Sequence, residues 1–436
     1  MKLYCGASKK CITPSPELLP ELYGLMGRSF STVHDELYLR VIAFSNGESK
    51  ALIVSFDLDK APQPEAFLSK LSESTGIPVE NILYFGIHTH TAPLCGPRPD
   101  FEKPKTEAAA RATEKYEAFV LEKLLSAAEE ALSAMEPARI GTGSGMSYLN
   151  VNRNQHYYYT ASDGTEYDLM GLGADFEGPV DHTARVIKIE NPEGRTIAML
   201  VNYALHNVVM ILNDPLGDGR VGIGADVGGN VSRCLEENYG GVAIWSSAAA
   251  GDINPVMMNQ YFYADPLTGE SRGMDVHSSE AAEAMLNIMT GRHLSDLKQI
   301  IKNISCEETD AFIGGDVQWS STPTENPEES WDIRLQALRI GSLAFMGIGG
   351  ELYTTLGKAV MDASPFENTW VINHNCSLIK DTGYILDDAA LARVKVKAPG
   401  LNTSRWVPGG GHAINLPGTV RPSLEKYTEL MFKKLS

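Results

Sequence analysis

A short apolar run that ends in two histidines most constrains what this chain can fold into. Ile82–Ile87 has the length and composition of a buried strand, and it stops at His88-Thr89-His90, before a loop rich in Pro and Gly. Ligands of open α/β sheets bind beyond the carboxyl ends of strands, so this position suits chemistry. If strand geometry persists across Thr89, both imidazoles point the same way. They then act as two metal ligands, as one ligand and one acid/base, or as a hydrogen-bonded structural pair.

Other apolar runs of strand length alternate with helical segments along the chain. The predicted strands are Met1–Ile12, Glu36–Phe44, Ala51–Leu58, Thr183–Glu190, Thr196–His206, Gly241–Ser247, Leu297–Cys306, Thr309–Ile313, Ile333–Gly347 and Trp370–Asn375. The predicted helices are Pro64–Gly76, Thr106–Met135, the end of Gly222–Glu237, Ser279–Thr290, Leu352–Asp362, Asp387–Val394 and Pro422–Leu435. Helices that separate strands in this way predict an α/β fold with mixed β-sheets flanked by helices.

No linker or change of composition divides the 436 residues, and no internal repeat is visible. One large domain over residues 1–436 is therefore expected, with Asn259–Met274 and Trp319–Trp331 as surface insertions. Tyr148–Tyr159 is expected to be a polar segment, and its tyrosine run either stacks on a sugar or packs on the core.

The acidic composition limits the classes of molecule that this protein is expected to bind. A net charge of −18 and a pI near 5.0 argue against a nucleic-acid surface and against anionic lipid. Residues 1–12 lack the apolar core of a secretory signal, and no apolar stretch is long enough to span a membrane. Because the six cysteines are scattered along the chain, we expect them to be reduced thiols. We expect a cytoplasmic protein with a small-molecule substrate; homo-oligomerisation stays open.

Coordinating side chains follow several of the apolar runs. Besides His88, these are His206, Glu351 and Tyr384. Two imidazoles and a carboxylate that leave an open position suit a catalytic zinc ion, with His90 as acid/base. Spacing alone does not show that these residues converge, because Glu and Tyr at strand ends are often structural.

Two aspartates and a run of small residues accompany these candidates. Asp226 and Asp252 are expected to orient ligand histidines from behind, and Asp252 is also a catalytic candidate as the only charge in Ala248–Pro255. The alanines and Gly251 in that segment let the backbone approach something closely.

Arg153 is a catalytic candidate that positions the substrate, and the candidates for substrate contact are His34, Asn207, Asp226 and His412. Arg153 is either an anion or carbonyl clamp or a solvated loop arginine. His34-Asp35 also suits a local hydrogen bond, and Gly409–His412 also suits an ordinary turn. His374 either faces the site from its strand or is a satisfied core histidine, and the second is expected.

Six short motifs resemble, in the same order, the catalytic domain of the neutral/alkaline (non-lysosomal) ceramidase family. They are HTHTAP, NVNRNQ, YALHNVVM, AAAGDINP, GGELYTTLG and TGYILDDAA, and together they run along nearly the whole chain. The resemblance implies one large catalytic domain of the neutral ceramidase type. It also implies that one zinc ion is held by His88, His206, Glu351 and Tyr384. It places His90 and Arg153 beside the substrate, and Asp226 resembles an aspartate of the family.

The chain departs from that family in three respects. Ala248 occupies the position of the family's catalytic serine, and Ser247, one residue early on a strand, would face the other way. The family's C-terminal β-rich domain and export signal are also expected to be lacking. We therefore expect a zinc-dependent hydrolase that attacks an amide or ester of a small soluble substrate other than ceramide. The alternatives are a metal-dependent carbohydrate-active enzyme (lyase, isomerase or glycoside-cleaving) and a non-catalytic family member.

Overall fold

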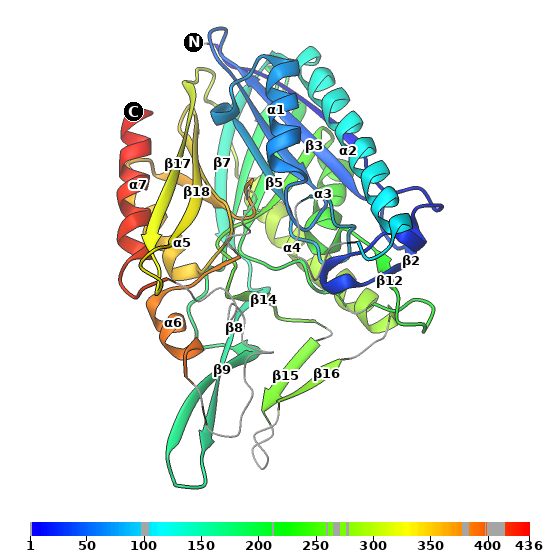
Figure 1. The fold of residues 1–436 in the computed structure, drawn as a ribbon. Helices are drawn as coiled ribbons and strands as arrows, with labels where there is room; N and C mark the ends of the chain where they lie inside the picture. Colours follow the sequence, from blue (N-terminus) through cyan, green and yellow to red (C-terminus); the bar gives the residue numbers. More distant parts are fainter. Residues whose placement is uncertain are drawn as a thin grey trace.

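Three β-sheets form the framework of the protein, and helices cover one face of each (Figure 1). The computed structural model describes residues 2–96, 104–211, 213–258, 260–264, 271–275, 279–376, 383–396, 398 and 415–436. The first sheet has the order β5-β4-β3-β1-β6, the second β13-β11-β10-β7 and the third β21-β19-β18-β17. Their strands are β1 Tyr4–Cys11, β3 Tyr38–Ser45, β4 Lys50–Phe56, β5 Ile82–Gly86, β6 Glu136–Pro137, β7 Arg139–Met146, β10 Thr183–Glu190, β11 Thr196–Tyr203, β13 Val242–Ser247, β17 Ile313–Pro323, β18 Ser330–Ile340, β19 Leu343–Ile348 and β21 Asn368–Ile372.

The same succession of elements builds each sheet. A first strand (β1, β7 or β17) pairs with an antiparallel hairpin, a helix follows the hairpin, and a last strand pairs in parallel with the hairpin's second strand. The helices in these units are α1 Pro64–Thr75, α3 Asp226–Tyr239 and α5 Thr354–Ala363. The expectation of no internal repeat is therefore wrong for the fold. The repeat is one of topology, which dissimilar sequences share.

The apolar core lies between the three sheets. Because side chains alternate along a strand, Ile42 of β3 faces this shared core while Val41 faces the helices. Leu200 of β11 and Phe345 of β19 pack into the same core. The sheets thus meet back to back, and their equivalent ends lie at one end of the molecule.

Separate apolar layers join each sheet to its helices. α1 and α2 (Glu107–Ser133) cover the first sheet, α3 and α4 (Ser279–Ile301) the second, and α5 and α7 (Val420–Lys434) the third. Thr106 caps α2 by accepting a hydrogen bond from Ala109 N. Gly6 permits the close approach of α2 to β1, since a Cβ there would lie 2.1 Å from Ala131 O.

Several sequence predictions fail in the second half of the chain. Leu297–Cys306 is not a strand, because α4 continues to Ile301 and a turn follows. Only Ile313 of Thr309–Ile313 belongs to a strand, and Ile333–Gly347 is divided by a turn at Gly341, where φ is 59°. Trp319–Trp331 is no insertion, because it forms the β17–β18 hairpin of the third sheet.

Smaller elements complete the fold. The polar segment Tyr148–Tyr159 falls largely in β8 (Asn150–Thr160), whose hairpin with β9 (Glu166–Asp175) projects from the body (Figure 1). The other short elements are β2 Phe30–Val33, β12 Val221–Ile223, β14 Ile253–Pro255, β15 Gln260–Ala264, β16 Ser271–Asp275, β20 Glu351–Leu352, β22 Tyr384–Ile385, α6 Asp388–Val394 and the 3₁₀ turns Leu19–Glu21, Leu25–Gly27 and Val79–Asn81.

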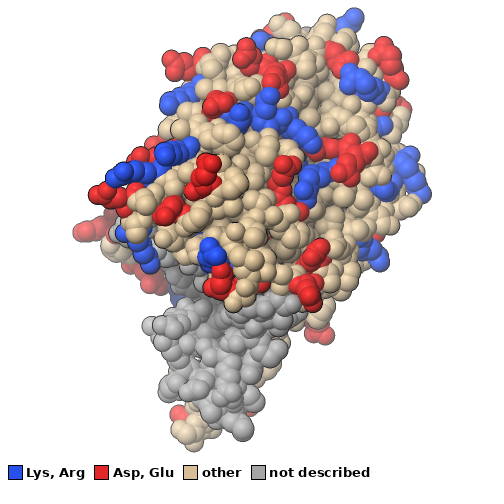
Figure 2. Space-filling view, turned by 90° about the vertical axis from the view of Figure 1, so that its right-hand side faces the viewer, with Lys and Arg blue, Asp and Glu red and all other residues tan. Residues whose placement is uncertain are grey.

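The surface carries charges of both signs. On the face seen in Figure 2, lysines and arginines are interspersed with acidic side chains and do not gather into a basic stripe. Among the described helices, none combines the length and apolar character needed to cross a membrane.

Candidate metal centre

Equivalent strand ends of the three units meet at one place. The last residue pairs of the parallel strands are Phe56–Gly86, Tyr203–Ser247 and Gly347–Ile372. Just beyond the second hairpin strands lie Asp59, His206 and Glu351, and just beyond the last strands lie His88, Ala249 and His374. The three β-sheets therefore deliver side chains from distant parts of the sequence to a common point.

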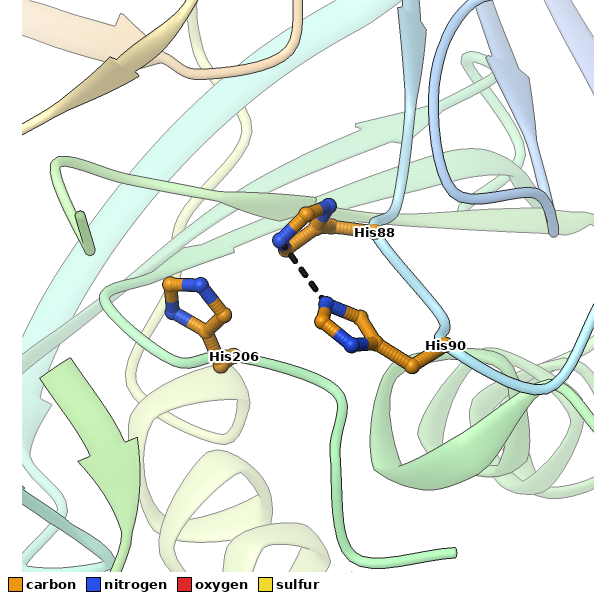
Figure 3. Close-up of side chains that lie close together, drawn as sticks. All are labelled: His88, His90 and His206. Carbon is orange, nitrogen blue, oxygen red and sulfur yellow. Dashed lines mark hydrogen bonds between the residues drawn. The ribbon is translucent and has the colours of Figure 1, made fainter. Parts of the chain in front are cut away.

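Three imidazoles converge there. The ligand nitrogens of His88, His90 and His206 lie within 4.8 Å of one another, and all three side chains are buried (Figure 3). His90 Nε2 lies 3.1 Å from His88 Nε2. The convergence does not arise from continued strand geometry, because β5 ends at Gly86 and His88 has a φ of 65°. A left-handed backbone at a histidine costs free energy and is typical of functional sites.

Glu351 joins the imidazoles from the third sheet. Its Oε2 atom lies 3.1 Å from His206 Nε2 and 3.5 Å from His88 Nε2. Although burial opposes ionisation, the charge of His88 holds the pKa of Glu351 well below its ordinary value. The carboxylate is therefore ionised at neutral pH and faces both imidazoles.

Different groups contact the Nδ1 atoms of His88 and His206. His88 Nδ1 lies 2.8 Å from Asp59 Oδ1 and 3.2 Å from the backbone carbonyl oxygen of Asp59, whereas His206 Nδ1 lies 2.8 Å from the carbonyl oxygen of Ile253 alone. Burial opposes the charged form of His88, but Glu351 and Asp59 together raise its pKa to about 9. Burial and the charge of Arg153 lower the pKa of His206 to about 3. The expectation that Asp226 or Asp252 orients these histidines is wrong.

The donor set fits a divalent cation. A carbonyl oxygen only accepts hydrogen bonds, so Nδ1 of the neutral His206 ring carries the proton and Nε2 presents its lone pair. That lone pair faces a carboxylate oxygen at 3.1 Å, which is unfavourable unless a cation lies between the two acceptors. His88 presents Nε2 in the same way when Asp59 accepts its Nδ1 proton. Two imidazole nitrogens and a carboxylate match the ligand preference of zinc.

His90 is held differently from the other two histidines. Its Nδ1 atom is buried and has no hydrogen-bond partner in the described part of the chain. Burial and the charge of His88 keep its pKa well below the ordinary value. Ligand histidines almost always donate their second N–H to an orienting group. His90 is neutral, and among the described residues nothing holds its Nδ1 atom as Asp59 and Ile253 hold those of His88 and His206.

Tyr384 and Arg153 lie together beside Glu351. Tyr384 pairs with Glu351 in the two-stranded β20–β22 sheet, and its ring stacks at 6.5 Å on that of His206. Arg153 is a buried residue of β8, not a solvated loop arginine. Its guanidinium carbon lies 5.0 Å from the centre of the Tyr384 ring, and Nη2 donates to Gly251 O at 2.7 Å. Both side chains are within the immediate surroundings of the carboxylate.

Asp226 and Asn207 brace the segment that follows His206. Asp226 Oδ2 accepts the N–H of Met210 at 2.8 Å, and burial raises the pKa of Asp226 to about 6. Asn207 donates to Ile87 O at 2.7 Å and accepts from Gly228 N at 2.9 Å. Both side chains are occupied within the fold, so their proposed contact with a substrate stays a prediction.

Asp252 links the segment after β13 to helix α5. One of its oxygens accepts from Thr354 N at 2.8 Å, and the other accepts from Asn152 at 3.0 Å. Burial raises the pKa of Asp252 to about 6. Gly251 permits the close approach expected of this segment, because a Cβ there would lie 2.4 Å from Glu351 O. The structure brings Asp252 to α5 and not to the imidazoles, and its catalytic role stays a prediction.

His34 does not contact the imidazoles or Glu351. His34 is exposed and lies 3.2 Å from Asp35, which in turn accepts hydrogen bonds from Asn230 and Arg233 of α3. The glycine-rich stretch Gly409–His412 falls outside the described residues.

The hydroxyl of Ser247, the serine next to Ala248, already makes a hydrogen bond within the fold. Ser247 Oγ donates to Leu205 O at 3.1 Å and lies near Ala248 O. Its hydroxyl therefore points to backbone carbonyls of the second sheet, which agrees with the expectation that it faces away. Ala248 packs with Ala204, Ala250 and Ile253 in a small apolar cluster.

Sequence reasoning missed two residues of the centre. Asp59 follows the apolar run of β4 just as His206 follows β11, so the rule that found His206 would also have found Asp59. His374 is not the satisfied core histidine that was expected. Its buried Nε2 has no partner among the described residues, and its ring lies 3.8 Å from that of His88. No pattern in the sequence distinguishes it from an ordinary strand residue.

Comparisons with known proteins agree with the fold expectation. No protein-family model matches the chain, and no curated protein matches it. The crystal structure of neutral ceramidase from Pseudomonas aeruginosa superposes with a TM-score of 0.69 and 13% identity, over 100% of this chain and 74% of that one. A structure described as ceramidase complexed with C2 gives a TM-score of 0.67 and 14% identity, over 100% of this chain and 75% of that one. The chain therefore has the fold of the neutral ceramidases.

Proposed function

We propose that the protein is a zinc-dependent hydrolase of amide or ester bonds in a small substrate. The observation that carries this proposal is the convergence of two imidazole Nε2 atoms on one carboxylate, at 3.1 and 3.5 Å, inside the fold of a known hydrolase class. His88, His206 and Glu351 are the proposed ligands. Tyr384 is the proposed fourth ligand, on the strength of its pairing with Glu351.

The chemistry needs a water nucleophile and a polarised carbonyl. A bound zinc ion supplies both, since it lowers the pKa of a ligand water to about 7 and acts as a Lewis acid. Ala248 and the engaged Ser247 argue against a serine nucleophile in this chain. The proposed mechanism is therefore direct attack by water.

His90 and Arg153 have the proposed roles next to that water. The neutral imidazole of His90 accepts a proton from the nucleophile and returns it to the leaving group. Arg153, buried beside Tyr384, donates hydrogen bonds to an oxygen of the substrate and holds the scissile bond in place. Asp59 and the Ile253 carbonyl keep His88 and His206 in the required tautomers.

Elemental analysis of the purified protein and of the His88→Ala and His206→Ala variants tests the ligand set. We expect about one zinc per chain in the native protein and loss of the metal in both variants. The Lys302→Ala variant changes an exposed residue at the end of α4 and serves as the control. Full metal content in both histidine variants would reject this set of ligands.

A substrate panel tests the reaction. N-acyl amines, simple esters, soluble glycosides and uronates are compared at equal concentration with the zinc-loaded protein. Turnover of amides or esters that disappears in the His206→Ala variant supports the hydrolase. Turnover only of the sugars would instead favour a carbohydrate-active enzyme, and no turnover by zinc-loaded protein would favour a non-catalytic protein.

A further inference from the structure

His374 is the counterpart of His88 in the third unit of the fold. Both residues come two positions after the last residue of a parallel strand, Gly86 for His88 and Ile372 for His374. Both adopt a left-handed backbone, with φ of 65° and 57°. This conformation is uncommon outside glycine and persists only where surrounding contacts impose it. The fold thus presents two imidazoles from equivalent turns.

The two rings are stacked face to face. Their centroids lie 3.8 Å apart and their planes differ by 13°, whereas His90 and His206 meet the His88 ring edge-on, at 84° and 71°. His374 is the only one of these neighbours that covers a face of the His88 ring. Its main chain is anchored as well, because His374 N donates to Gly350 O in the turn before Glu351.

We propose that His374 is a positioning residue that fixes the plane of the His88 ring. Asp59 holds one edge of the His88 ring at Nδ1 but leaves the ring free to tilt about that contact. A flat ring at 3.8 Å removes this freedom and keeps Nε2 directed at Glu351. The hydrogen bond of His374 to the Gly350 turn links the position of this ring to that of Glu351. The proposal rests on the proposed function in that His88 is taken as a metal ligand.

Three variants separate stacking from space filling and from hydrogen bonding. His374→Phe keeps a flat ring but has no nitrogen, and His374→Leu fills much of the space without a ring. His293→Leu is the matched control, because His293 is also buried, has an unpartnered Nε2 and packs on an aromatic ring, that of Tyr203 at 4.6 Å. It has no ring contact with the three imidazoles in the described part of the chain.

The first measurement is the zinc affinity of the metal-stripped proteins, by calorimetry against a competing chelator. We expect His374→Leu to lose roughly tenfold in affinity, at the lower end of the effects of orienting residues, and His374→Phe to stay within about threefold of wild type. The His293→Leu variant is expected to melt at a lower temperature but to bind zinc as wild type does. Wild-type affinity in His374→Leu would overturn the proposal. So would an equal loss in His374→Phe, because the nitrogen and not the stack would then matter.

The second measurement does not depend on metal. Crystal structures of the metal-free proteins are expected to show one orientation of the His88 ring in wild type and in His374→Phe, and more than one in His374→Leu. A single unchanged orientation in His374→Leu would overturn the proposal. Failure of the wild-type protein to bind zinc would contradict the proposed function alone, and the ring orientation would still decide the role of His374.

Discussion

The turn after β5 and the turn after β11 each bring an imidazole to the same point, but they hold it differently. His88 is backed by the carboxylate of Asp59 and lies on a left-handed backbone. His206 is backed by the neutral carbonyl of Ile253. The carboxylate contributes to raising the pKa of His88 to about 9, whereas burial and Arg153 lower that of His206 to about 3.

This difference bears on the proposal that both imidazoles are metal ligands. In the metal-free protein a proton on His88 balances the charge of Glu351, while His206 stays neutral. A cation that binds must displace the His88 proton but meets His206 ready to coordinate. His90, from the same turn as His88, has no hydrogen-bond partner at Nδ1 among the described residues and is the proposed proton acceptor.

The largest effect on zinc affinity is expected from removing an imidazole whose Nδ1 atom has a hydrogen-bond partner. His206→Ala deletes a ligand, so zinc affinity should fall by more than roughly 100-fold, beyond the losses typical of orienting residues. Competition calorimetry on the metal-stripped variant measures this. An affinity within a few-fold of wild type would remove His206 from the centre.

The His90→Gln variant should instead keep its zinc affinity and lose turnover. Zinc affinity should stay within about threefold, because His90 lacks the orienting partner typical of ligands, while kcat falls by roughly 10²–10⁴ as for a lost acid/base. Calorimetry and steady-state kinetics on the same preparation give both numbers. If the variant loses zinc as His206→Ala does, His90 is a third imidazole ligand.

Asp59→Asn should weaken zinc binding through its effect on His88 alone. The amide can still accept the Nδ1 proton but carries no charge, so zinc affinity should fall by roughly 10- to 100-fold. Asp226→Asn is the matched control, since that buried aspartate braces the His206 segment without contacting an imidazole. Equal losses in both variants would contradict a specific role for Asp59.

The raised pKa of His88 predicts how pH affects binding and stability. Between pH 6.5 and about 9, zinc displaces one proton, so apparent affinity should rise about tenfold per pH unit. Protonated His88 stabilises the metal-free protein fully below pH 6.5, and this contribution is lost as pH rises through about 9. Melting temperatures of the metal-free protein should fall over that range, and those of Glu351→Gln should fall less. A flat profile in the metal-free protein would contradict the His88–Glu351 pairing.

The smallest effect is expected at Ser247. Because its hydroxyl donates to Leu205 O and does not face the imidazoles, Ser247→Ala should cost about 1 kcal/mol of stability and leave kcat unchanged. Chemical denaturation and steady-state kinetics measure the two. A large loss of kcat at unchanged zinc content would instead make Ser247 a nucleophile.

Local signals predicted the strands that carry the centre but not how they are arranged. The abrupt end of Ile82–Ile87 at a histidine was readable because apolar runs and strand ends are local features. The apolar stretch from Leu297 was misread as a strand because short apolar runs do not distinguish a buried strand from the buried face of α4.

The parts of the centre that sequence could not supply depend on topology. His374 acquires its place from the threefold repetition of the sheets, which no sequence pattern shows, whereas Asp59 follows an apolar run and could have been found in the sequence. The left-handed turns at His88 and His374 are imposed by tertiary contacts and are unusual for histidine.

Anomalous diffraction at the zinc edge from crystals of the zinc-loaded protein tests the central claim most directly. One ion is expected within about 2.0–2.2 Å of His88 Nε2, His206 Nε2 and a Glu351 oxygen, with His90 Nε2 outside that distance. An ion bound elsewhere, or coordinated without Glu351, would contradict the account.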